Sequence, residues 1–349
     1  MDTLTMEIRA LDPWDDAALA AFHATYHAAD VFGREHAAPW MLEEMRADLR
    51  GSRTGERFEC WTGLVDDSSD TGPGGVVSCG MLVLPMKDNL DLAIVRVWTR
   101  PESRRRGYGS AMLDHVVAAA AEAGRSTLVA DAHVPFEAPE DGVGYPDPDF
   151  AYARGWGFDM CDVVRVLPLP VDDGRLAALG EEAAPHHADY TLRQFKGPVP
   201  DDIVEEFGRL VGSLMVEAPT GAVALEEEVL DVERIRADEA VFAAAGRTKY
   251  TTVALARDGS VVAYSELVVP AYDPGAIFQW GTLVDRGHRG HRLGMATKVA
   301  NLRWVQREAP DRNRVYTMNA EVNEQMIGIN ATLGFLPVER HVSLHRRLT

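Results

Sequence analysis

The chain has 349 residues, of which 46% are hydrophobic and 26% are charged, and 54 Asp and Glu against 35 Lys and Arg give a net charge of −19. This length is more than one ordinary domain needs, and the composition is typical of a soluble globular protein and excludes a disordered or fibrous one. The acidic field repels nucleic acid and anionic membranes and favours a cationic ligand, so we expect neither nucleic acid nor a membrane as partner.

The cysteines and the N-terminal segment narrow the class of protein further. The three cysteines, Cys60, Cys79 and Cys161, are odd in number and lack metal-ligand spacing, which argues against a disulfide framework or a zinc site. The first residues lack the basic and apolar regions of a signal peptide, and no apolar run approaches the roughly 18 residues that span a bilayer. We expect a cytoplasmic protein.

In chain order, the first half begins with helical patterns and continues with strand patterns. Helices are expected over residues 17–27 and 39–49, and strands over 58–65 and 75–84, joined by a turn at 66–75. A further strand follows over 93–99, then an Arg/Gly-rich turn at 104–109 and a helix over 110–123.

The second half repeats this order, which makes the repeat the main organising feature. Helices are expected over 201–214 and 225–245, strands over 251–256 and 261–269, then a strand, an Arg/Gly-rich turn and a helix over 277–284, 289–294 and 295–308. The halves stay in register to strands at 129–134 and 317–322, although the first carries extra loop residues within 133–150. The fold class is therefore α/β with a mixed sheet in each of two tandem domains.

We place the domains at residues 1–171 and 189–349, separated by a linker over 172–188. The segment between the halves mixes Pro, Ala, Asp and Glu without the alternation of a strand. It suits a linker with one short helix around 175–182.

The Arg/Gly-rich turn between a strand and a helix indicates a pyrophosphate site. Such a turn leaves unpaired N–H groups at the positive end of the helix, while Gly107, Gly109 and Gly294 permit close backbone approach. A solvated basic turn is the simpler reading of one copy, but two copies in register argue against it. The chain has neither a P-loop motif nor a complete Gly-x-Gly-x-x-Gly.

The sequence Arg104-x-x-Gly107-x-Gly109 resembles the central motif of the GCN5-related N-acetyltransferase (GNAT) superfamily. The second copy departs from it by having Arg292 where the first glycine is usual. Its surroundings, from Val284 to Gly334-Phe335, also look like this superfamily. The resemblance covers nearly the whole chain and is closest to the tandem two-domain type, similar to mycothiol synthase and other actinobacterial double-domain acetyltransferases.

The resemblance implies acetyl-CoA as the acyl donor, with backbone N–H groups near the last residues of the strand before the loop polarising the thioester. We expect the second domain to be the catalytic half, because the strand-end carboxylates Glu266 and Glu321 are available only there. The cofactor residues that the resemblance implies there are Leu283, Val284, Arg289, Gly290, His291, Arg292, Leu293, Gly294, Met295, Ala296, Asn323 and Asn330. In the first domain, which we expect to be a non-catalytic half, they are Trp98, Thr99, Arg104, Arg105, Arg106, Gly107, Tyr108, Gly109 and Ser110.

Direct attack by an amine in a ternary complex requires a base, because an alkyl amine is mostly protonated at neutral pH. Glu266 and Glu321 are the candidates, although each can equally be a solvated carboxylate at a strand end. Asn330 stands where many members have a tyrosine that reaches the CoA sulfur, so the second domain needs another acid, water or none. Segments 217–220 and 250–266 would flank the acceptor cleft. No metal is expected, because His288 and His291 lack a third ligand.

Two further readings remain open at the level of the sequence. The chain can be a non-catalytic acyl-CoA-binding or interaction protein, which the missing tyrosine at position 330 favours. It can also be a mycothiol synthase-like enzyme. Acceptor pockets are built from variable loops, so the sequence specifies a small-molecule amine only as a class and leaves the oligomeric state undetermined.

Overall fold

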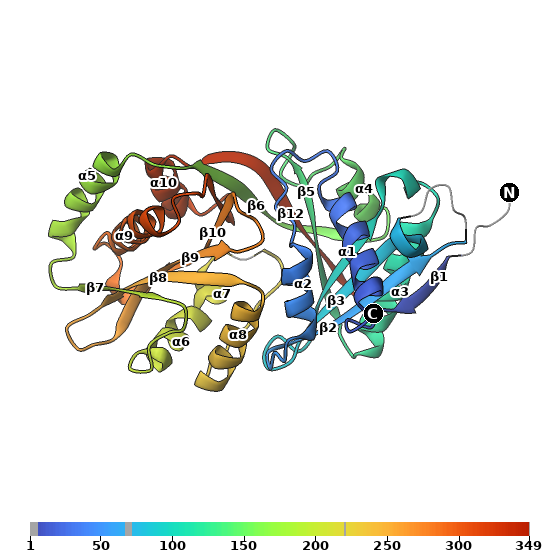
Figure 1. Cartoon of the computed structure of the whole chain (residues 1–349), viewed down its shortest axis with the longest axis horizontal. Coiled ribbons are helices and arrows are strands. Elements are labelled where there is room, and N and C mark those ends of the chain that lie inside the picture. Colours follow the sequence, from blue (N-terminus) through green and yellow to red (C-terminus); the bar gives the residue numbers. More distant parts are fainter. Residues whose placement is uncertain (1–5, 67–71, 220, 349) are drawn as a thin grey trace. The chain divides into compact units, whose positions relative to one another are not determined.

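The computed structural model describes residues 6–66, 72–219 and 221–348. The chain forms two compact units, which we call unit 1 (residues up to Met160, together with Val342 onward) and unit 2 (Cys161–His341). Each unit contains a mixed sheet with helices packed against it (Figure 1). The expected α/β fold class is confirmed. No helix in the described ranges is both long and apolar enough to cross a bilayer.

Unit 1 is built around strands in the order β1-β2-β3-β4-β5-β12. The strands pair in antiparallel fashion from β1 to β4, and β4 pairs with β5 in parallel. Its elements are β1 (Glu7–Ala10), α1 (Asp16–Asp30), α2 (Leu42–Arg50), β2 (Glu56–Leu64), β3 (Val76–Pro85), β4 (Leu92–Thr99), α3 (Tyr108–Glu122), β5 (Thr127–Pro135), α4 (Pro146–Tyr152) and the end of β12 (Leu336–Arg347).

Alternation along β3 explains why unit 1 has helices on both faces of its sheet. Leu82 belongs to a buried cluster with Met112 of α3, whereas Met81 belongs to another cluster with Phe22 of α1. Successive strand residues point to opposite faces, so a strand whose residues are nearly all apolar must be covered twice.

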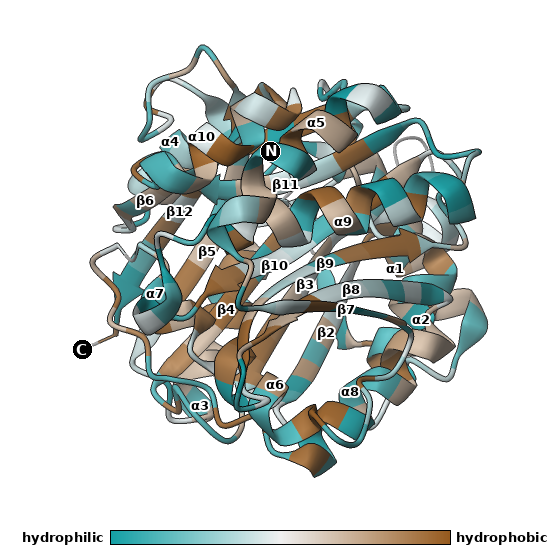
Figure 2. Ribbon diagram, turned by 90° about the vertical axis from the view of Figure 1, so that its left-hand side faces the viewer, coloured by the Kyte–Doolittle hydropathy of each residue, from teal (hydrophilic) through white to brown (hydrophobic). Residues whose placement is uncertain are grey.

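Unit 2 repeats this plan with strands in the order β6-β11-β10-β9-β8-β7. Helix α9 covers one face of the central strands, while α6 and α8 cover the other (Figure 1), and hydrophobic segments lie along those strands (Figure 2). Its elements are β6 (Gly157–Pro168), α5 (Asp173–Ala183), β7 (Thr191–Lys196), α6 (Val204–Gly212), α7 (Leu214–Glu217), α8 (Val232–Ala244), β8 (Arg247–Leu255), β9 (Val261–Pro270), β10 (Ala276–Val284), α9 (Leu293–Glu308), β11 (Arg314–Ala320) and α10 (Glu324–Leu333).

Each half of the sequence gives one strand to the other unit. Strand β6 follows the elements of unit 1 in sequence but pairs with β11 in unit 2, and the end of β12 lies beside β5 in unit 1. The boundaries of the units therefore fall within β6 and β12, not in the expected linker 172–188. That segment contains α5, which packs on α9 with Leu176 fully buried.

Candidate functional site

The strand that leads into the Arg/Gly loop is bulged in unit 2 and regular in unit 1. In β10, Gln279 pairs with Leu267 and Thr282 with Ser265, so Trp280 and Gly281 face the single residue Glu266 across the strand pair. The corresponding strand β4 pairs with β3 without such a shift. A bulge of this kind bends the strand and leaves one residue out of the ladder.

Packing on both sides holds the bulge. The amide Nε2 of Gln279 donates to the backbone carbonyl of Glu266 at 2.6 Å, and this side chain is buried. On the other side, a Cβ on Gly281 would lie 2.3 Å from the hydroxyl of Tyr264, so the position requires glycine. The extra residue also shifts the alternation of side chains along β10 between the two faces of the sheet. Val284, after the bulge, therefore packs with Leu293 at the start of α9.

The strand that leads into the Arg/Gly loop, which we call the motif strand, separates from its parallel neighbour after three paired residues in both units. Strand β10 pairs with β11 from Ala276 to Phe278, and β4 pairs with β5 from Leu92 to Ile94. In each pair the strands continue beyond the last paired residue. Backbone groups after that point are free of the parallel ladder, which leaves them available to a ligand.

The two Arg/Gly loops have the same backbone conformation although their sequences differ. Arg104 Nε donates to the carbonyl of Thr99 at 3.3 Å, and Arg289 Nε donates to that of Val284 at 3.3 Å. Left-handed residues then occur twice in each loop, and the last of them is the N-cap of the following helix. They are Arg105 (φ 64°) and Gly107 (φ 92°) in unit 1, and Gly290 (φ 86°) and Arg292 (φ 52°) in unit 2.

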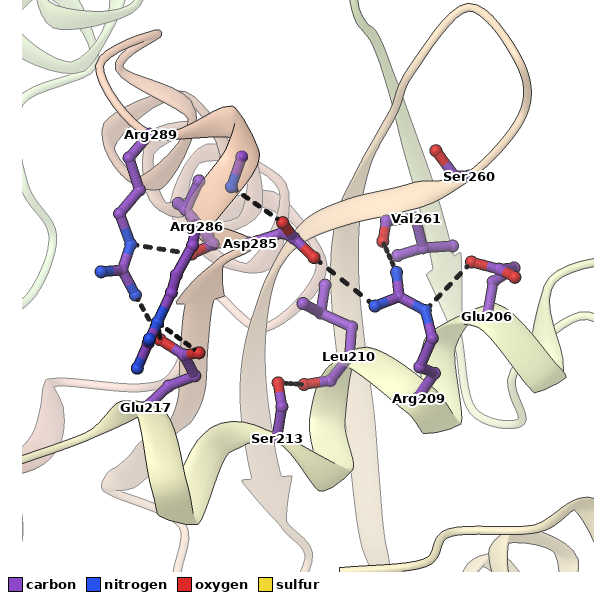
Figure 3. A network of polar contacts seen from close by, with 12 residues as sticks. Glu206, Arg209, Leu210, Ser213, Glu217, Ser260, Val261, Asp285, Arg286 and Arg289 are labelled. Carbon is purple, nitrogen blue, oxygen red and sulfur yellow. Dashed lines mark hydrogen bonds and ion pairs between the residues drawn. The ribbon is translucent and has the colours of Figure 1, made fainter. Parts of the chain in front are cut away.

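The charged partners of the two loops are different. In unit 2 the carboxylate of Glu217 lies 2.7 Å from both Arg286 and Arg289 (Figure 3), and Arg292 forms an ion pair with Glu182. In unit 1, neither Arg104 nor Arg105 has a carboxylate partner in the described part of the chain; the guanidinium of Arg104 lies 5.2 Å from the ring centroid of Phe32.

Comparison with known proteins agrees with this geometry. Residues 23–138 match the Acetyltransferase (GNAT) family. A tandem GNAT protein from the clavulanic acid biosynthesis pathway is 27% identical, with 98% of each chain covered and a TM-score of 0.76. The chain therefore contains a GNAT family domain at residues 23–138 and is similar over nearly its whole length to a tandem GNAT protein, which indicates an acyltransferase.

Two more distant structures share the fold alone. A GCN5-related N-acetyltransferase from Sphaerobacter thermophilus is 13% identical, with 98% of this chain and 95% of that one covered and a TM-score of 0.59. A putative acetyltransferase from Pyrococcus horikoshii is 12% identical, with 100% and 91% covered and a TM-score of 0.54. No curated protein sequence matches the chain.

The first residues after each loop form the first turn of a helix. Leu293 and Ala296 are buried in the first turn of α9, together with Gly294 and the half-buried Met295. Tyr108 is buried at the start of α3, followed by Gly109, and Ser110 accepts a hydrogen bond from Arg154. The N–H groups of these first turns lack partners within the helix, as an anion site requires.

The remaining strand-end residues are held by their neighbours. Leu283 is buried against α6, and Trp98 stacks edge-on with Tyr26 at 5.0 Å in unit 1. The hydroxyl of Thr99 lies 3.1 Å from that of Ser78.

Glu266 lies on β9 opposite the bulge, on the face of the sheet that α8 covers. Its carboxylate is buried and lies 3.0 Å from the Nζ of Lys249. Lys249 lies over the rings of Phe242 and Trp280, which contact each other edge to face at 4.8 Å. The carboxylate, the ammonium group and the two rings form a cluster directly beside the bulged residues.

Glu321 lies just after β11, which pairs with β10 only through residues 314–316. Its carboxylate forms an ion pair with Arg340, and its backbone N–H donates to the carbonyl of Cys161 at 3.1 Å. This carboxylate is thus anchored to β12, whereas Glu266 lies on β9 opposite the bulge.

The two asparagines of the implied site serve α10. Asn323 is the N-cap of α10 and accepts from the N–H of Met326 at 3.1 Å. Asn330 is fully buried, and its amide donates to Asn319 on β11 at 3.1 Å. The structure therefore uses the side chain at position 330 to join α10 to the sheet.

The loop histidines contact the segment between α5 and β7. The Nδ1 of His288 lies 3.0 Å from the hydroxyl of Tyr190, and the Nδ1 of His291 lies 3.1 Å from the carbonyl of His186. These contacts hold the loop against the segment between α5 and β7 of the same unit.

Sequence reasoning missed the residues that neutralise the loop of unit 2. The sequence alone marks Glu217 only as a residue flanking the acceptor cleft and does not mark Arg286, Glu182 or Asp285. Their partners are far away in the sequence, so no local motif identifies them. The one local signal is Arg286 itself, a third arginine beside Arg289 and Arg292.

Proposed function

We propose that the chain is an acetyl-CoA-dependent N-acetyltransferase that acetylates a small-molecule amine, with the reaction in unit 2. The bulge at Trp280 and Gly281 is the observation that carries this proposal. It lies in β10, the strand that leads into the anion-binding loop. It comes after the point at which β10 separates from its parallel neighbour β11. Backbone donors released there would stabilise negative charge on a thioester oxygen, an effect typically worth about 2.7–4 kcal/mol per donor.

The loop that follows β10 supports acetyl-CoA as the acyl donor. Its two left-handed residues and the N-terminus of α9 present N–H groups to an anion, and its arginines already hold a carboxylate. These residues fit a pyrophosphate, whose oxygens accept hydrogen bonds from guanidinium groups as carboxylate oxygens do.

The cluster beside the bulge supports an amine as the acceptor. Trp280 is 44% exposed there, and an aromatic face attracts a cationic ammonium group. Glu266 would accept the proton that the amine must lose before or during attack on the thioester, while the thiolate leaves with CoA. No covalent protein intermediate is needed, because the amine attacks directly in a ternary complex.

Unit 1 favours a second role, the binding of acyl-CoA without turnover. Its strand β4 pairs with β3 without a bulge. Its loop has the same backbone, and Arg104 and Arg105 have no carboxylate partner within residues 6–66, 72–219 and 221–348. We propose a cytoplasmic location, which is supported by three free, buried cysteines.

A screen of amine acceptors with acetyl-CoA, following the release of free CoA, tests the proposed function. With an active acceptor, Glu266→Gln should lower the rate about 10²- to 10⁴-fold near neutral pH, with partial recovery at higher pH as the amine deprotonates unaided. Glu321→Gln is the matched variant, since it removes a carboxylate that is ion-paired to Arg340 and does not lie on β9 opposite the bulge. A larger loss in Glu321→Gln would make Glu321 the base, and no CoA release with any amine would refute the proposed function.

A further inference from the structure

Glu217 is positioned like a bound anion in the cofactor loop of unit 2. Its carboxylate lies 2.7 Å from the Nε of Arg286 and 2.7 Å from a terminal nitrogen of Arg289. The Glu217 side chain is only 16% exposed, whereas those of Arg286 and Arg289 are 70% and 42% exposed. The carboxylate is therefore covered by the two arginines, which remain open to solvent on their other sides.

The helix pair that carries Glu217 is attached to the loop at two points, as Figure 3 shows. Arg209 on α6 lies 3.4 Å from Asp285, the N-cap of the short 3-10 turn that contains Arg286, and also 3.4 Å from the carbonyl of Val261. Glu217 at the end of α7 makes the second attachment. The first can persist while the second opens, because they are on different helices.

A single residue joins the two helices. Ser213 is both the C-cap of α6 and the N-cap of α7. Helix α6 is fixed where Gly212 packs against the segment after α7, since a Cβ on Gly212 would lie 2.2 Å from the carbonyl of Glu228. Helix α7 is one short turn: Leu214 at its start packs against the core of unit 2, Met215 and Val216 are exposed, and Glu217 at its end contacts the loop.

Unit 1 provides the internal comparison. The residue at the place of Arg286 is Pro101, which begins the matching 3-10 turn and carries no charge. Arg104, which matches Arg289 in its hydrogen bond to the preceding strand, has no carboxylate partner among the described residues. Among the described residues, the same loop backbone thus occurs with a carboxylate on Arg289 in unit 2 and without one on the matching Arg104 in unit 1.

We propose that Glu217 is an internal anion that the pyrophosphate of acetyl-CoA displaces from Arg286 and Arg289, and that Arg286 is a further cofactor-binding residue. Displacement releases the end of α7, which Glu217 otherwise holds on the loop. This inference rests on the proposed function, because it assumes that the loop of unit 2 takes acetyl-CoA. The apparent affinity is reduced by the fraction of molecules in which Glu217 occupies the arginines.

Calorimetric titration of acetyl-CoA tests this, in a Gly109→Trp background that blocks the loop of unit 1. Glu217→Gln should tighten binding about three- to tenfold, the size expected from removing two partly exposed ion pairs. Glu206→Gln is the matched control, since Glu206 pairs with Arg209 on α6 and does not contact Arg286 or Arg289; its affinity should equal that of the parent. Arg286→Gln should weaken binding although it also frees Glu217 from one partner.

Backbone exchange gives a second measurement that is independent of affinity. The N–H of Ala218 donates to the carbonyl of Leu214 at 2.9 Å in the present state, and its exchange should accelerate when acetyl-CoA binds. Equal or weaker binding in Glu217→Gln would overturn the inference, because Glu217 would then orient the arginines and not compete with the cofactor. If the Gly109→Trp variant, in which only the loop of unit 2 is open, binds no acetyl-CoA but the wild type does, the proposed role of unit 2 fails together with this inference.

Discussion

The two Arg/Gly loops have the same backbone conformation although the order of arginine and glycine at their left-handed positions is reversed. Unit 1 has arginine then glycine at its two left-handed positions, Arg105 and Gly107, while unit 2 has glycine then arginine, Gly290 and Arg292. A motif defined by glycine positions recognises the first loop more readily, and the family match indeed falls on residues 23–138. The two loops share the path of the backbone. Residues other than glycine can also adopt this path, although a side chain at positive φ is strained.

The motif strands differ in the opposite direction. The loop with the more regular sequence follows the regular strand β4, and the loop with the irregular sequence follows the bulged strand β10. Under the proposed function, cofactor binding depends on the loop and stabilisation of the thioester depends on the strand. Both units have the loop conformation, whereas the motif strand is bulged in β10 and regular in β4.

Blocking each loop in turn is the strongest test of this difference between the units. Gly294→Trp should abolish acetyl transfer, because a Cβ at this position already lies 3.3 Å from Ile329 and an indole would fill the start of α9. Gly109→Trp is the matched change in unit 1 and should leave transfer within about twofold, since the ligand path of unit 2 is intact. Initial rates of CoA release, with thermal unfolding as a check of folding, decide between them. Loss of activity only in Gly109→Trp would assign catalysis to unit 1.

Removing the bulge gives a large but smaller effect. Deletion of Gly281 makes β10 eight residues long, the length of β4, and restores a regular register. We expect the rate at saturating acetyl-CoA to fall about 10²- to 10³-fold, as for the loss of one preorganised donor. The Kd for acetyl-CoA should change little, because the loop is retained. A deletion variant that stays folded and fully active would refute the role of the bulge.

The helices after the loops differ at several core positions, one of which predicts an effect on stability. Unit 2 has Lys298 where unit 1 has the buried Leu113, each four residues after the glycine in the first turn of the helix. Burial lowers the pKa of Lys298 to about 7 from its usual 10.5. In the unfolded chain this lysine binds its proton up to about pH 10.4, so the wild type gains stability as pH rises from about 7 to 10.

Lys298→Leu should therefore stabilise the protein by a few kcal/mol at pH 6 and by clearly less near pH 10. Denaturant unfolding at both pH values measures the difference. The same gain at both values would mean that Lys298 does not titrate in this range, and that packing alone explains the substitution.

The smallest expected effect comes from the left-handed arginines. Arg292→Gly should raise stability by about 0.5–1 kcal/mol, because a side chain at positive φ is strained and glycine is not. The lost ion pair with Glu182 is between largely exposed groups and contributes little. Arg105→Gly is the same change in unit 1, and both unfolding midpoints should rise. A fall in either would show that the arginine stabilises its loop by more than the strain.

The sequence predicted the order of elements well, because periodicity is a local property. Helices expected at 17–27 and 39–49 correspond to α1 and α2, and the strand expected at 261–269 corresponds to β9. The turn expected at 66–75 lies partly outside the described residues. The exchange of β6 and β12 was not predicted, since alternation within a strand identifies its buried face but not its neighbour.

The candidate site was predictable where it depends on the motif and unpredictable where it depends on distant partners. Arg289 and Gly294 were found from spacing alone, and their cofactor roles remain predictions. The bulge requires the pairing of β9 with β10, and the Glu217 contact requires α7 to lie beside the loop. Both are tertiary features that a single strand or helix does not encode.

The exchange of strands has a consequence for synthesis on the ribosome. Residues up to Met160 emerge first, but the strand that lies beside β5 in unit 1, ending at Arg347, emerges only after all of unit 2. Until then the edge of β5 has no partner on that side, and an unpaired edge invites pairing with other chains. A truncated chain containing only the first 160 residues should therefore aggregate, and the nascent chain depends on rapid completion or on a chaperone at that edge.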